Sequence, residues 1–353
     1  MIEIQGDLLE GGGQIVRTTL ALSALTGKPV CITKIREKRP NPGLQAQHFI
    51  AAKALAALCN AETNDLTVGS LQLTFIPHDR VGGRFAFDVG TAGSIPLILQ
   101  ALMPATVYAP TPLEFEITGG TDVRWSPSID YVRLTQLPLL GKMGYEATVR
   151  VRRRGHYPKG GGSVHVTTTP PRILKAVCWI NRGELIDIEG VSHCVGLPSH
   201  VAQRQANAAK EKLRLAGFGN VNVAIETFPP NQDPHVAPGS GITLIAKFAS
   251  GGILGADSLG ERGKPAESVG EAAALKLLEE LKTESPLDKH MGDMIIPYMA
   301  VAEGRSEVRV SEITNHTLTN IWVGELMTGV KFNVEGELHT PGKIAVDGIA
   351  LKT

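Results

Sequence analysis

The chain contains few of the residues that mark several common classes of protein. Only four of its 353 residues are cysteine and 5% are aromatic, and 35 Lys and Arg residues balance 35 Asp and Glu residues. Four scattered cysteines do not make a disulfide framework, and balanced charge excludes a polycation that coats nucleic acid. So few aromatic residues also exclude an extended surface that stacks many bases.

Long hydrophobic runs are lacking too. The longest apolar stretch, residues 95–109, is interrupted by Gln100 and Pro104 and is too short to span a bilayer. Residues 1–7 carry acidic side chains where a secretory signal peptide has a basic flank and an apolar run. We therefore expect a cytoplasmic protein that does not bind membranes, and the hydrophobic content of 42% predicts folded domains.

Familiar nucleotide-binding and metal-binding motifs are also missing. The sequence has no G-x-x-x-x-G-K-[ST] phosphate loop, no G-x-G-x-x-G after a predicted strand and no H-E-x-x-H zinc helix. Any phosphate chemistry must therefore use a different arrangement of residues.

Three segments of the chain share one order of predicted elements: a helix, a strand, a polar turn, and a second helix. Apolar residues at i, i+3 and i+4 predict the helices, and alternating polar and apolar residues predict the strands. The helices are predicted at 14–25, 44–58, 94–102, 129–140, 293–302 and 318–327, and the strands at 29–35, 113–118, 147–151, 307–310 and 330–334.

The spacing of these segments predicts an insertion. The second helices begin near Leu44, Ile129 and Leu318, and the second step exceeds the first by roughly 100 residues, the size of a small domain. We expect an α/β (α+β) fold with a main domain of three repeated units, each pairing two helices on a small β-sheet, interrupted by a smaller α/β domain. The expected boundaries are 1–183 and 282–353 for the main domain and 184–281 for the inserted domain.

The segment from Glu10 to Arg17 opens the first helix with three consecutive glycines. Glycines at a helix N-terminus let the backbone approach an anionic ligand. Glu10 could hold a divalent cation, and Arg17 would lie one helical turn further along on the same side. The alternative is a plain tight turn in which Glu10 complements the helix dipole.

Basic residues gather in the turn that follows the first predicted strand. Arg36 and Arg39 lie at a strand end, where α/β folds place their ligands, and Gln47 and His48 follow in the next helix. Two arginines so placed could hold a phosphate bidentately. A solvated charged turn is the alternative interpretation.

The equivalent turn of the third unit carries His316. A neutral imidazole there could be a nucleophile, a general base or a ligand. A lone histidine is more often a hydrogen-bonded structural residue, but its position in the repeat favours a functional role. Two further stretches are weaker candidates. Residues 150–162 carry four arginines, which could bind a polyanion or could protect an exposed strand edge from pairing. Residues 118–127 could form the wall of a base-binding pocket or could simply be a loop.

Taken together, these residues resemble the RNA 3′-terminal phosphate cyclase family. The matches occur in family order and span nearly the whole chain. They are Glu10-Gly-Gly-Gly-Gln14 with Arg17, Arg36-x-x-Arg39-x-x-Pro42-Gly43, Gln47-His48, Thr91-Ala-Gly-Ser94 with Gln100, Gly119-Gly-Thr-Asp122, Gly160-Gly-Gly162, and His316-x-x-Thr319-Asn320.

The resemblance implies an ATP-dependent enzyme that converts an RNA 3′-terminal phosphate to a 2′,3′-cyclic phosphodiester. His316 would attack the α-phosphorus of ATP, with Mg²⁺ or Mn²⁺ present, to form a histidine–AMP intermediate. AMP would then pass to the RNA end, giving an RNA–pp–A anhydride that the 2′-hydroxyl resolves. The partners would be ATP and an RNA 3′-phosphate end, and a homodimer is left open.

The resemblance also assigns residues to subsites. Glu10 would contact the metal, and Arg17, Arg36, Arg39 and Gln47 would line the phosphate and RNA site. Family members can place a tyrosine at the position of His290 to stack on adenine, so a histidine there would stack more weakly. The residues that correspond to the adenosine pocket are Gln100, Pro127, His290, Met291, Gly292, Asp293 and Met294.

Two other interpretations compete with this one. Cyclase-like proteins that have lost the nucleophile act as non-catalytic RNA-binding factors in ribosome assembly, but His316 is present here with Thr319 and Asn320. Enolpyruvyl transferases share a similar repeat architecture and form no covalent nucleotide, and the His316 motif argues against them.

Overall fold

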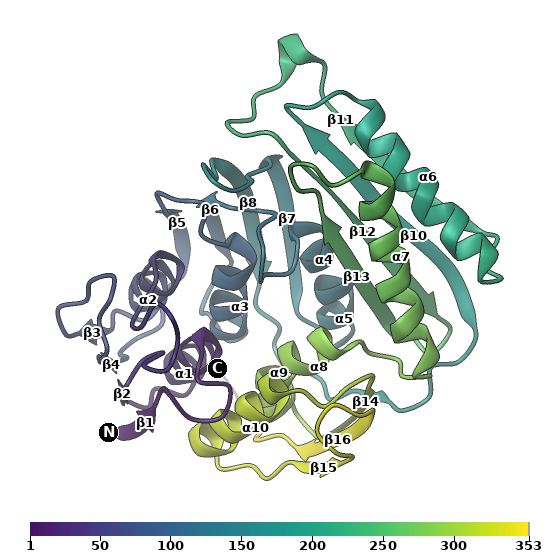
Figure 1. Cartoon of the computed structure of the whole chain (residues 1–353). Coiled ribbons are helices and arrows are strands. Elements are labelled where there is room, and N and C mark those ends of the chain that lie inside the picture. The colour runs from purple at the N-terminus through teal and green to yellow at the C-terminus, as the bar shows by residue number, and fades with distance from the viewer. Residues whose placement is uncertain (352–353) are drawn as a thin grey trace.

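The computed structural model describes residues 1–351 and confirms the predicted α/β fold. Among these residues there are four mixed sheets of four strands each (Figure 1). The first sheet has the order β1-β2-β4-β3, and its two helices follow the glycines and the basic turn. Its elements are β1 (Ile2–Gln5), α1 (Gly13–Thr26), β2 (Val30–Thr33), α2 (Ala46–Leu58), β3 (Glu62–Thr63) and β4 (Leu73–Ile76).

The second unit has a sheet of order β5-β6-β8-β7, and its second helix is not continuous. Where the sequence predicts one helix over 129–140, the chain forms two α-helical segments joined by a π-turn at Val132–Gln136. Pro138 has no N–H to donate back along the helix, which explains the irregular turn before it. The elements are β5 (Gly83–Asp88), α3 (Ile95–Thr106), β6 (Leu113–Gly119), α4 (Ile129–Tyr131), α5 (Leu137–Lys142), β7 (Glu146–Arg153) and β8 (Gly162–Thr169).

The third unit has a sheet of order β15-β16-β14-β9. Its first helix starts earlier than predicted, where the Asp288 side chain caps the backbone N–H groups of His290 and Met291, and it divides just before Pro297. The elements are β9 (Cys178–Trp179), α8 (Lys289–Met294), α9 (Ile296–Val301), β14 (Arg305–Val310), α10 (Asn315–Thr328), β15 (Asn333–Glu335) and β16 (Gly342–Asp347).

Between β9 and α8 the chain forms a fourth sheet, of order β11-β10-β12-β13, whose helices α6 and α7 pack against each other on one face (Figure 1). We call residues 185–282 the inserted module and the other described residues the main body. The module has a hydrophobic cluster of its own. The division into domains at 183/184 and 281/282 stays a prediction. Its elements are β10 (Leu185–Val195), α6 (His200–Leu215), β11 (Val221–Thr227), β12 (Gly239–Phe248), β13 (Ile253–Leu259) and α7 (Ala266–Lys282).

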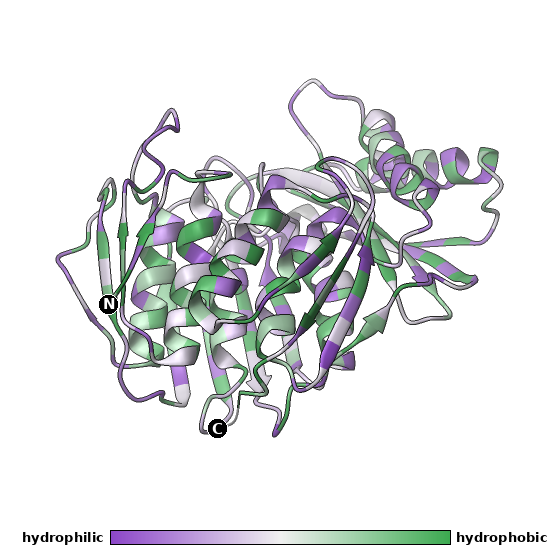
Figure 2. Cartoon of the chain, turned by 90° about the horizontal axis from the view of Figure 1, so that it is seen from below, coloured by the Kyte–Doolittle hydropathy of each residue, from purple (hydrophilic) through white to green (hydrophobic). Residues whose placement is uncertain are grey.

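The helices of the main body share one core. Helix α1 packs against α2, α3 and α10, and its residues from Gln14 to Leu25 are buried. Figure 2 shows hydrophobic colours dominating the central helices, while the strands alternate between hydrophobic and hydrophilic residues. No helix among the described residues is long and apolar enough to cross a membrane. Because α1 packs against α10, Glu10 at the start of α1 lies beside His316 at the start of α10.

Candidate active site

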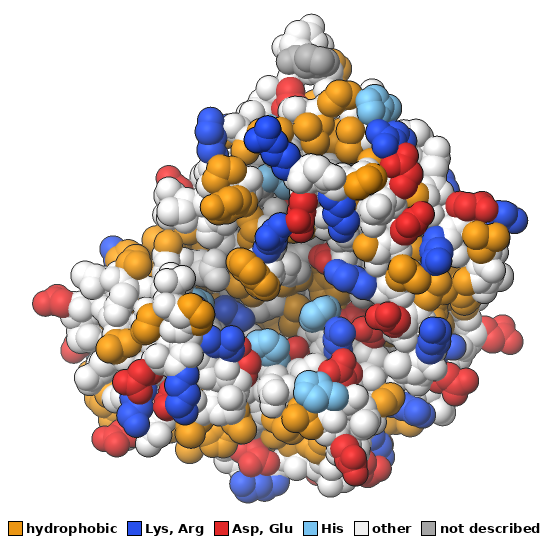
Figure 3. Space-filling model, viewed as in Figure 1, with side chains coloured by type: hydrophobic (Ala, Val, Ile, Leu, Met, Phe, Trp, Pro, Cys, Tyr) orange, Lys and Arg blue, Asp and Glu red, His pale blue; other side chains and the backbone are white. Residues whose placement is uncertain are grey.

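A cavity of about 1670 Å³ opens between the main body and the inserted module. Figure 3 shows the hollow in the middle of this face, with Lys, Arg and His side chains gathered around it. Six residues that the sequence predicts for the site line this one cavity: five come from the first 47 residues, and one lies far from them in the sequence. They are Glu10, Arg17, Arg36, Arg39, Gln47 and His316.

The Glu10 carboxylate lies over the start of α1. A Cβ atom on Gly12 would come within 2.3 Å of the Glu10 side-chain oxygens, so a larger residue there would displace the carboxylate from this position. One oxygen, Oε1, accepts a hydrogen bond from Arg39. The other, Oε2, is buried without a partner. An unpaired buried carboxylate oxygen is a fitting ligand for a hard divalent cation, so the residues present suit Mg²⁺ or Mn²⁺.

Three arginines surround this single carboxylate. Burial lowers the pKa of Arg17 to about 10, Glu10 raises it and Arg36 lowers it further, so Arg17 remains cationic at neutral pH. Burial and neighbouring Arg39 likewise lower the pKa of Arg36. Arg36 donates to the carbonyl oxygens of Asn41 and Gly43, which fixes its guanidinium. The excess of positive charge here favours an anion such as a phosphate group.

His316 is the second residue of α10 and is half-exposed in the cavity. Its Nδ1 lies 4.0 Å from Glu10 Oε2. The first turn of the helix is closed by Thr314, whose hydroxyl accepts from the backbone N–H of Thr317. The Asp293 carboxylate then accepts from the hydroxyls of Thr314 at 2.7 Å and Thr317 at 2.6 Å. This buried network fixes the first turn of α10, which carries His316.

Asn320 connects the helix of His316 to the helix of the glycine loop. Its amide donates to the Asp293 backbone carbonyl at 2.6 Å, and its carbonyl accepts from Gln14 at 2.9 Å and Thr18 at 2.7 Å. The Glu10 backbone N–H adds a longer bond of 3.3 Å to the Thr319 hydroxyl. Thr319 and Asn320 therefore hold the N-terminal ends of α1 and α10 next to each other at the cavity.

The neighbouring residues Gln47 and His48 are fixed in different ways. Gln47 accepts from the backbone N–H of Ser94 at 3.0 Å, which ties the first unit to the second. His48 is buried, and its Nδ1 accepts from the backbone N–H of Gln45 at 3.1 Å. Burial, helped by Arg17 and Arg36, lowers the pKa of His48 to about 3, so its imidazole is neutral. Its Nε2 lies against Gly13, where any Cβ would collide with it.

The residues predicted for the adenosine pocket are not part of the lining of this cavity. Asp293 is buried below the first turn of α10, and burial raises the pKa of its carboxyl group. His290 is exposed, with its ring edge-on to Tyr131 at a centroid distance of 6.2 Å. Of the others, Met291, Gly292 and Met294 are buried, whereas Gln100 and Pro127 are partly exposed. Their role in binding adenosine stays a prediction.

The arginine-rich stretch at 150–162 contributes a structural residue. Arg154 is fully buried and donates to Asp130 at 2.7 Å, to Asp122 at 3.2 Å and to Glu226 of the inserted module through two bonds. These three carboxylates raise the pKa of Arg154 despite its burial. All three guanidinium nitrogens thus donate to carboxylates, and the side chain joins the main body to the module.

Two exposed aromatic side chains at the cavity are not among the residues that the sequence predicts for the site. Trp125 is 93% exposed and adopts a positive φ of 59°, and Tyr157 is 78% exposed. Both line the cavity, as does Arg124, which pairs with Glu261 of the module. Neither residue belongs to a periodic pattern, but both occur in the two weaker candidate stretches, residues 118–127 and 150–162.

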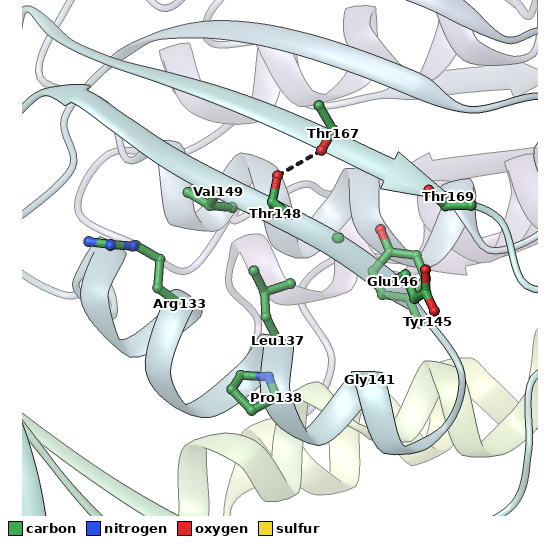
Figure 4. Close-up of a pocket in the computed structure, with 11 residues that line it drawn as sticks. Arg133, Leu137, Pro138, Gly141, Tyr145, Glu146, Thr148, Val149, Thr167 and Thr169 are labelled. Atoms are coloured by element: carbon green, nitrogen blue, oxygen red, sulfur yellow. Dashed lines mark hydrogen bonds between the residues drawn. The ribbon is translucent and has the colours of Figure 1, made fainter.

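A second, smaller hollow of about 480 Å³ lies between α5 and the β7–β8 hairpin (Figure 4). A hydrogen bond of 2.7 Å between the hydroxyls of Thr148 and Thr167 crosses its wall. None of the residues predicted for the site lines this hollow, so the large cavity is the candidate active site.

The sequence of the chain matches one known family over most of its length. A family model described as RNA 3′-terminal phosphate cyclase matches residues 8–334. The chain is 51% identical over 358 residues to the RNA 3′-terminal phosphate cyclase of Hyperthermus butylicus, with 100% of this chain and 99% of that protein covered. It is 49% identical over 350 residues to that of Ignicoccus hospitalis, with 99% of each covered, and 47% identical over 354 residues to that of Pyrococcus furiosus, with 98% of each covered.

Proposed function

Because the chain belongs to the RNA 3′-terminal phosphate cyclase family, we propose that it uses ATP to convert an RNA 3′-terminal phosphate to a 2′,3′-cyclic phosphodiester through an AMP adduct on His316. One observation carries the proposal: a half-exposed imidazole, an unpaired carboxylate oxygen and three arginines share one cavity. Nucleophilic attack on a phosphate group requires a nucleophile and positive charge to stabilise the phosphate oxygens, and these groups can supply both.

The reaction runs in three displacements. The His316 imidazole attacks the α-phosphorus of ATP, a P–N bond forms, and the bond to the β-phosphate breaks to release pyrophosphate. An oxygen of the RNA 3′-phosphate then attacks the same phosphorus, the P–N bond breaks, and the RNA–pp–A anhydride forms. Finally the 2′-hydroxyl attacks the terminal RNA phosphorus, loses its proton, and releases AMP as the ring closes.

An imidazole is suited to carry AMP because it attacks when neutral and leaves readily when protonated. The Nδ1 atom of His316 faces the Glu10 carboxylate at 4.0 Å. With Nδ1 directed at that carboxylate, Nε2 is the nitrogen left to attack. When Nδ1 carries a proton, the imidazole leaves the phosphorus as a neutral group as the RNA phosphate displaces it.

The guanidinium groups of Arg17, Arg36 and Arg39 would stabilise the negative charge that develops on the phosphoryl oxygens in each displacement. Gln47 would add a contact to the RNA phosphate. Glu10 would hold Mg²⁺ or Mn²⁺ through its unpaired Oε2. A divalent cation bound there supplies charge neutralisation at the phosphates.

Adenosine would be bound near Gln100, Pro127, His290 and the segment from Met291 to Met294. What supports this assignment is the contact of the Asp293 carboxylate with the first turn of the His316 helix. A nucleotide held against that turn would place its α-phosphorus near the imidazole. Asp293 would then position His316 and hydrogen-bond the nucleotide from the same side chain.

The test uses two RNA oligonucleotides that end in 3′-phosphate, one with a ribose and the other with a 2′-deoxyribose at the last position. With ATP and Mg²⁺, wild-type protein should cyclise the ribose end and leave the deoxy end as the adenylated RNA, because that end lacks the attacking hydroxyl. His316→Ala should form neither product. His78→Ala is the matched control, since its imidazole has the same 46% exposure outside the cavity. Cyclisation by His316→Ala at the wild-type rate would refute the mechanism.

A further inference from the structure

Three metal-ligating side chains meet where the inserted module contacts the main body. Asp122 follows β6, His156 lies in the loop between β7 and β8, and His193 lies on β10 of the module. All three are buried, and their candidate ligand atoms lie within 4.8 Å of one another. We call them the junction cluster. The chemistry proposed for His316 uses none of them.

The imidazoles of the junction cluster lack hydrogen-bond partners. Neither ring nitrogen of His193 has one, and Nε2 of His156 has none. The two rings lie 5.3 Å apart between centroids. A buried imidazole nitrogen without a partner costs desolvation energy, so its retention calls for a ligand. Burial also lowers the pKa of both histidines, which keeps them neutral and leaves each with a lone pair.

Asp122 is oriented as metal-binding carboxylates usually are. Its Oδ2 accepts from the Thr121 hydroxyl at 2.7 Å and from Arg154 at 3.2 Å, which fixes the group. Its other oxygen, Oδ1, is buried and has no partner. Carboxylates that bind metals are commonly held by hydrogen bonds to one oxygen while the other oxygen is free to bind the ion. Burial alone would raise the pKa of Asp122, but the cationic Arg154 beside it lowers that pKa and keeps the carboxylate ionised.

The backbone of the module is shaped around these rings. Strand alternation puts Ser192 toward helix α6, where its hydroxyl donates to the Ala202 carbonyl, and therefore puts His193 on the opposite face. Gly239 and Gly241 lie beside the two imidazoles: a Cβ on Gly239 would be 2.1 Å from the His156 ring, and one on Gly241 would be 3.0 Å from that of His193. Asp122, His156 and Gly239 also line the cavity, so an ion could enter from it.

We propose that Asp122, His156 and His193 form a binding site for a transition-metal dication of the Zn²⁺ type, which fastens the inserted module to the main body. Two imidazoles and a carboxylate are a common ligand set for zinc, and zinc holds such atoms at about 2.0–2.2 Å. The three ligand atoms lie within 4.8 Å of one another, so side-chain shifts of about 1 Å would bring each of them to about 2.0–2.2 Å from a single ion. The fourth ligand could be a water molecule that enters from the cavity, which Asp122 and His156 line.

This site is separate from the Mg²⁺ or Mn²⁺ position at Glu10 in both residues and ligand chemistry. Glu10 offers a hard carboxylate oxygen beside arginines, whereas the junction cluster offers nitrogen ligands. The proposal does not depend on the reaction of His316. A protein that never forms an AMP adduct could still bind the ion at the junction.

The test is zinc binding by the full chain, freed of metal with a chelator and then titrated with ZnCl₂ or with Co²⁺ as a coloured probe. Wild type should bind one ion per chain tightly, with a visible Co²⁺ spectrum typical of tetrahedral coordination, and zinc should raise its midpoint of thermal unfolding. His193→Gln and Asp122→Asn keep side-chain shape and should each weaken binding at least tenfold. Circular dichroism would verify that both variants are folded.

His200→Ala serves as the control because His200 is exposed on α6 of the same module. It should bind zinc as wild type does. Glu10→Gln should also keep the junction ion, which separates the two sites even if cyclisation fails. Two results would each overturn the proposal: no zinc bound above the level of His193→Gln, or full zinc binding by folded His193→Gln and Asp122→Asn together.

Discussion

Two buried arginines of this molecule, Arg17 and Arg154, differ in whether carboxylates pair with them. Arg17 is buried at the cavity wall, its Nε has no partner, and burial lowers its pKa to about 10. Arg154 is buried at the module junction, where three carboxylates bond it and raise its pKa. A cation without a carboxylate partner is poised for an incoming anion, whereas a fully paired cation is part of the scaffold.

The two groups of histidines differ in exposure. His316 is half-exposed beside Glu10, and the first turn of its helix is held by hydrogen bonds, as a nucleophile requires. His193 is buried with both nitrogens unpaired. Residue type alone therefore does not separate reactive groups from structural ones. Pairing and exposure do.

Removing the scaffold arginine should have the largest effect. Arg154→Met leaves Asp122, Asp130 and Glu226 facing one another without their cation, and we expect the free energy of unfolding to fall by about 3–5 kcal/mol. Urea denaturation measures this. Arg153→Met is the control, since Arg153 is only partly buried and makes a single bond to the Gly161 carbonyl. An equal loss in both variants would show that the ion network has no special role.

Removing the poised arginine should instead cost activity. Arg17→Met is expected to slow cyclisation by roughly 100- to 1000-fold because one stabilising donor is lost from the phosphate site. The free energy of unfolding should stay the same or rise, since a desolvated cation without a carboxylate partner is removed. Single-turnover cyclisation and urea denaturation on the same sample measure both. A large loss of stability with little change in rate would place Arg17 with the scaffold.

The smallest expected effect is a pH dependence at the module contact. Burial, with Asp288 nearby, raises the pKa of Glu280 to about 7. The folded protein therefore holds a proton that the unfolded chain releases, and stability falls as pH rises from about 4.5 to about 7. Glu280→Gln should remove this decline, so at about pH 8 it should exceed wild type by about 2–3 kcal/mol. Equal stability of the two proteins at every pH would contradict this origin.

Much of the fold could be predicted because it depends on local pattern. Helix α1 differs from its prediction by one residue at each end, and α2 begins two residues later than predicted and ends at the predicted residue. The breaks near Pro138 and Pro297 were missed because apolar periodicity continues through them. Short edge strands such as β3, with two exposed residues, carry no pattern that could be detected.

The residues of the candidate site likewise include some that the sequence can predict and some that it cannot. His316 could be found because the repeat places it at the turn equivalent to the basic turn of the first unit. The role of Arg154 could not, because its three carboxylates lie 24, 32 and 72 residues away in sequence. In the sequence it is one of several arginines in a basic stretch. Only the packing of the module against the main body shows that this one is paired.

The central claim is that His316 carries AMP, and its most direct test is to locate the adduct. The protein is incubated with Mg²⁺ and ATP labelled at the α-phosphate, without RNA, and then digested for mass spectrometry. The account predicts an acid-labile, alkali-stable AMP group on the peptide that contains His316, and no label on His316→Ala. Label on another residue, or undiminished label on His316→Ala, would contradict it.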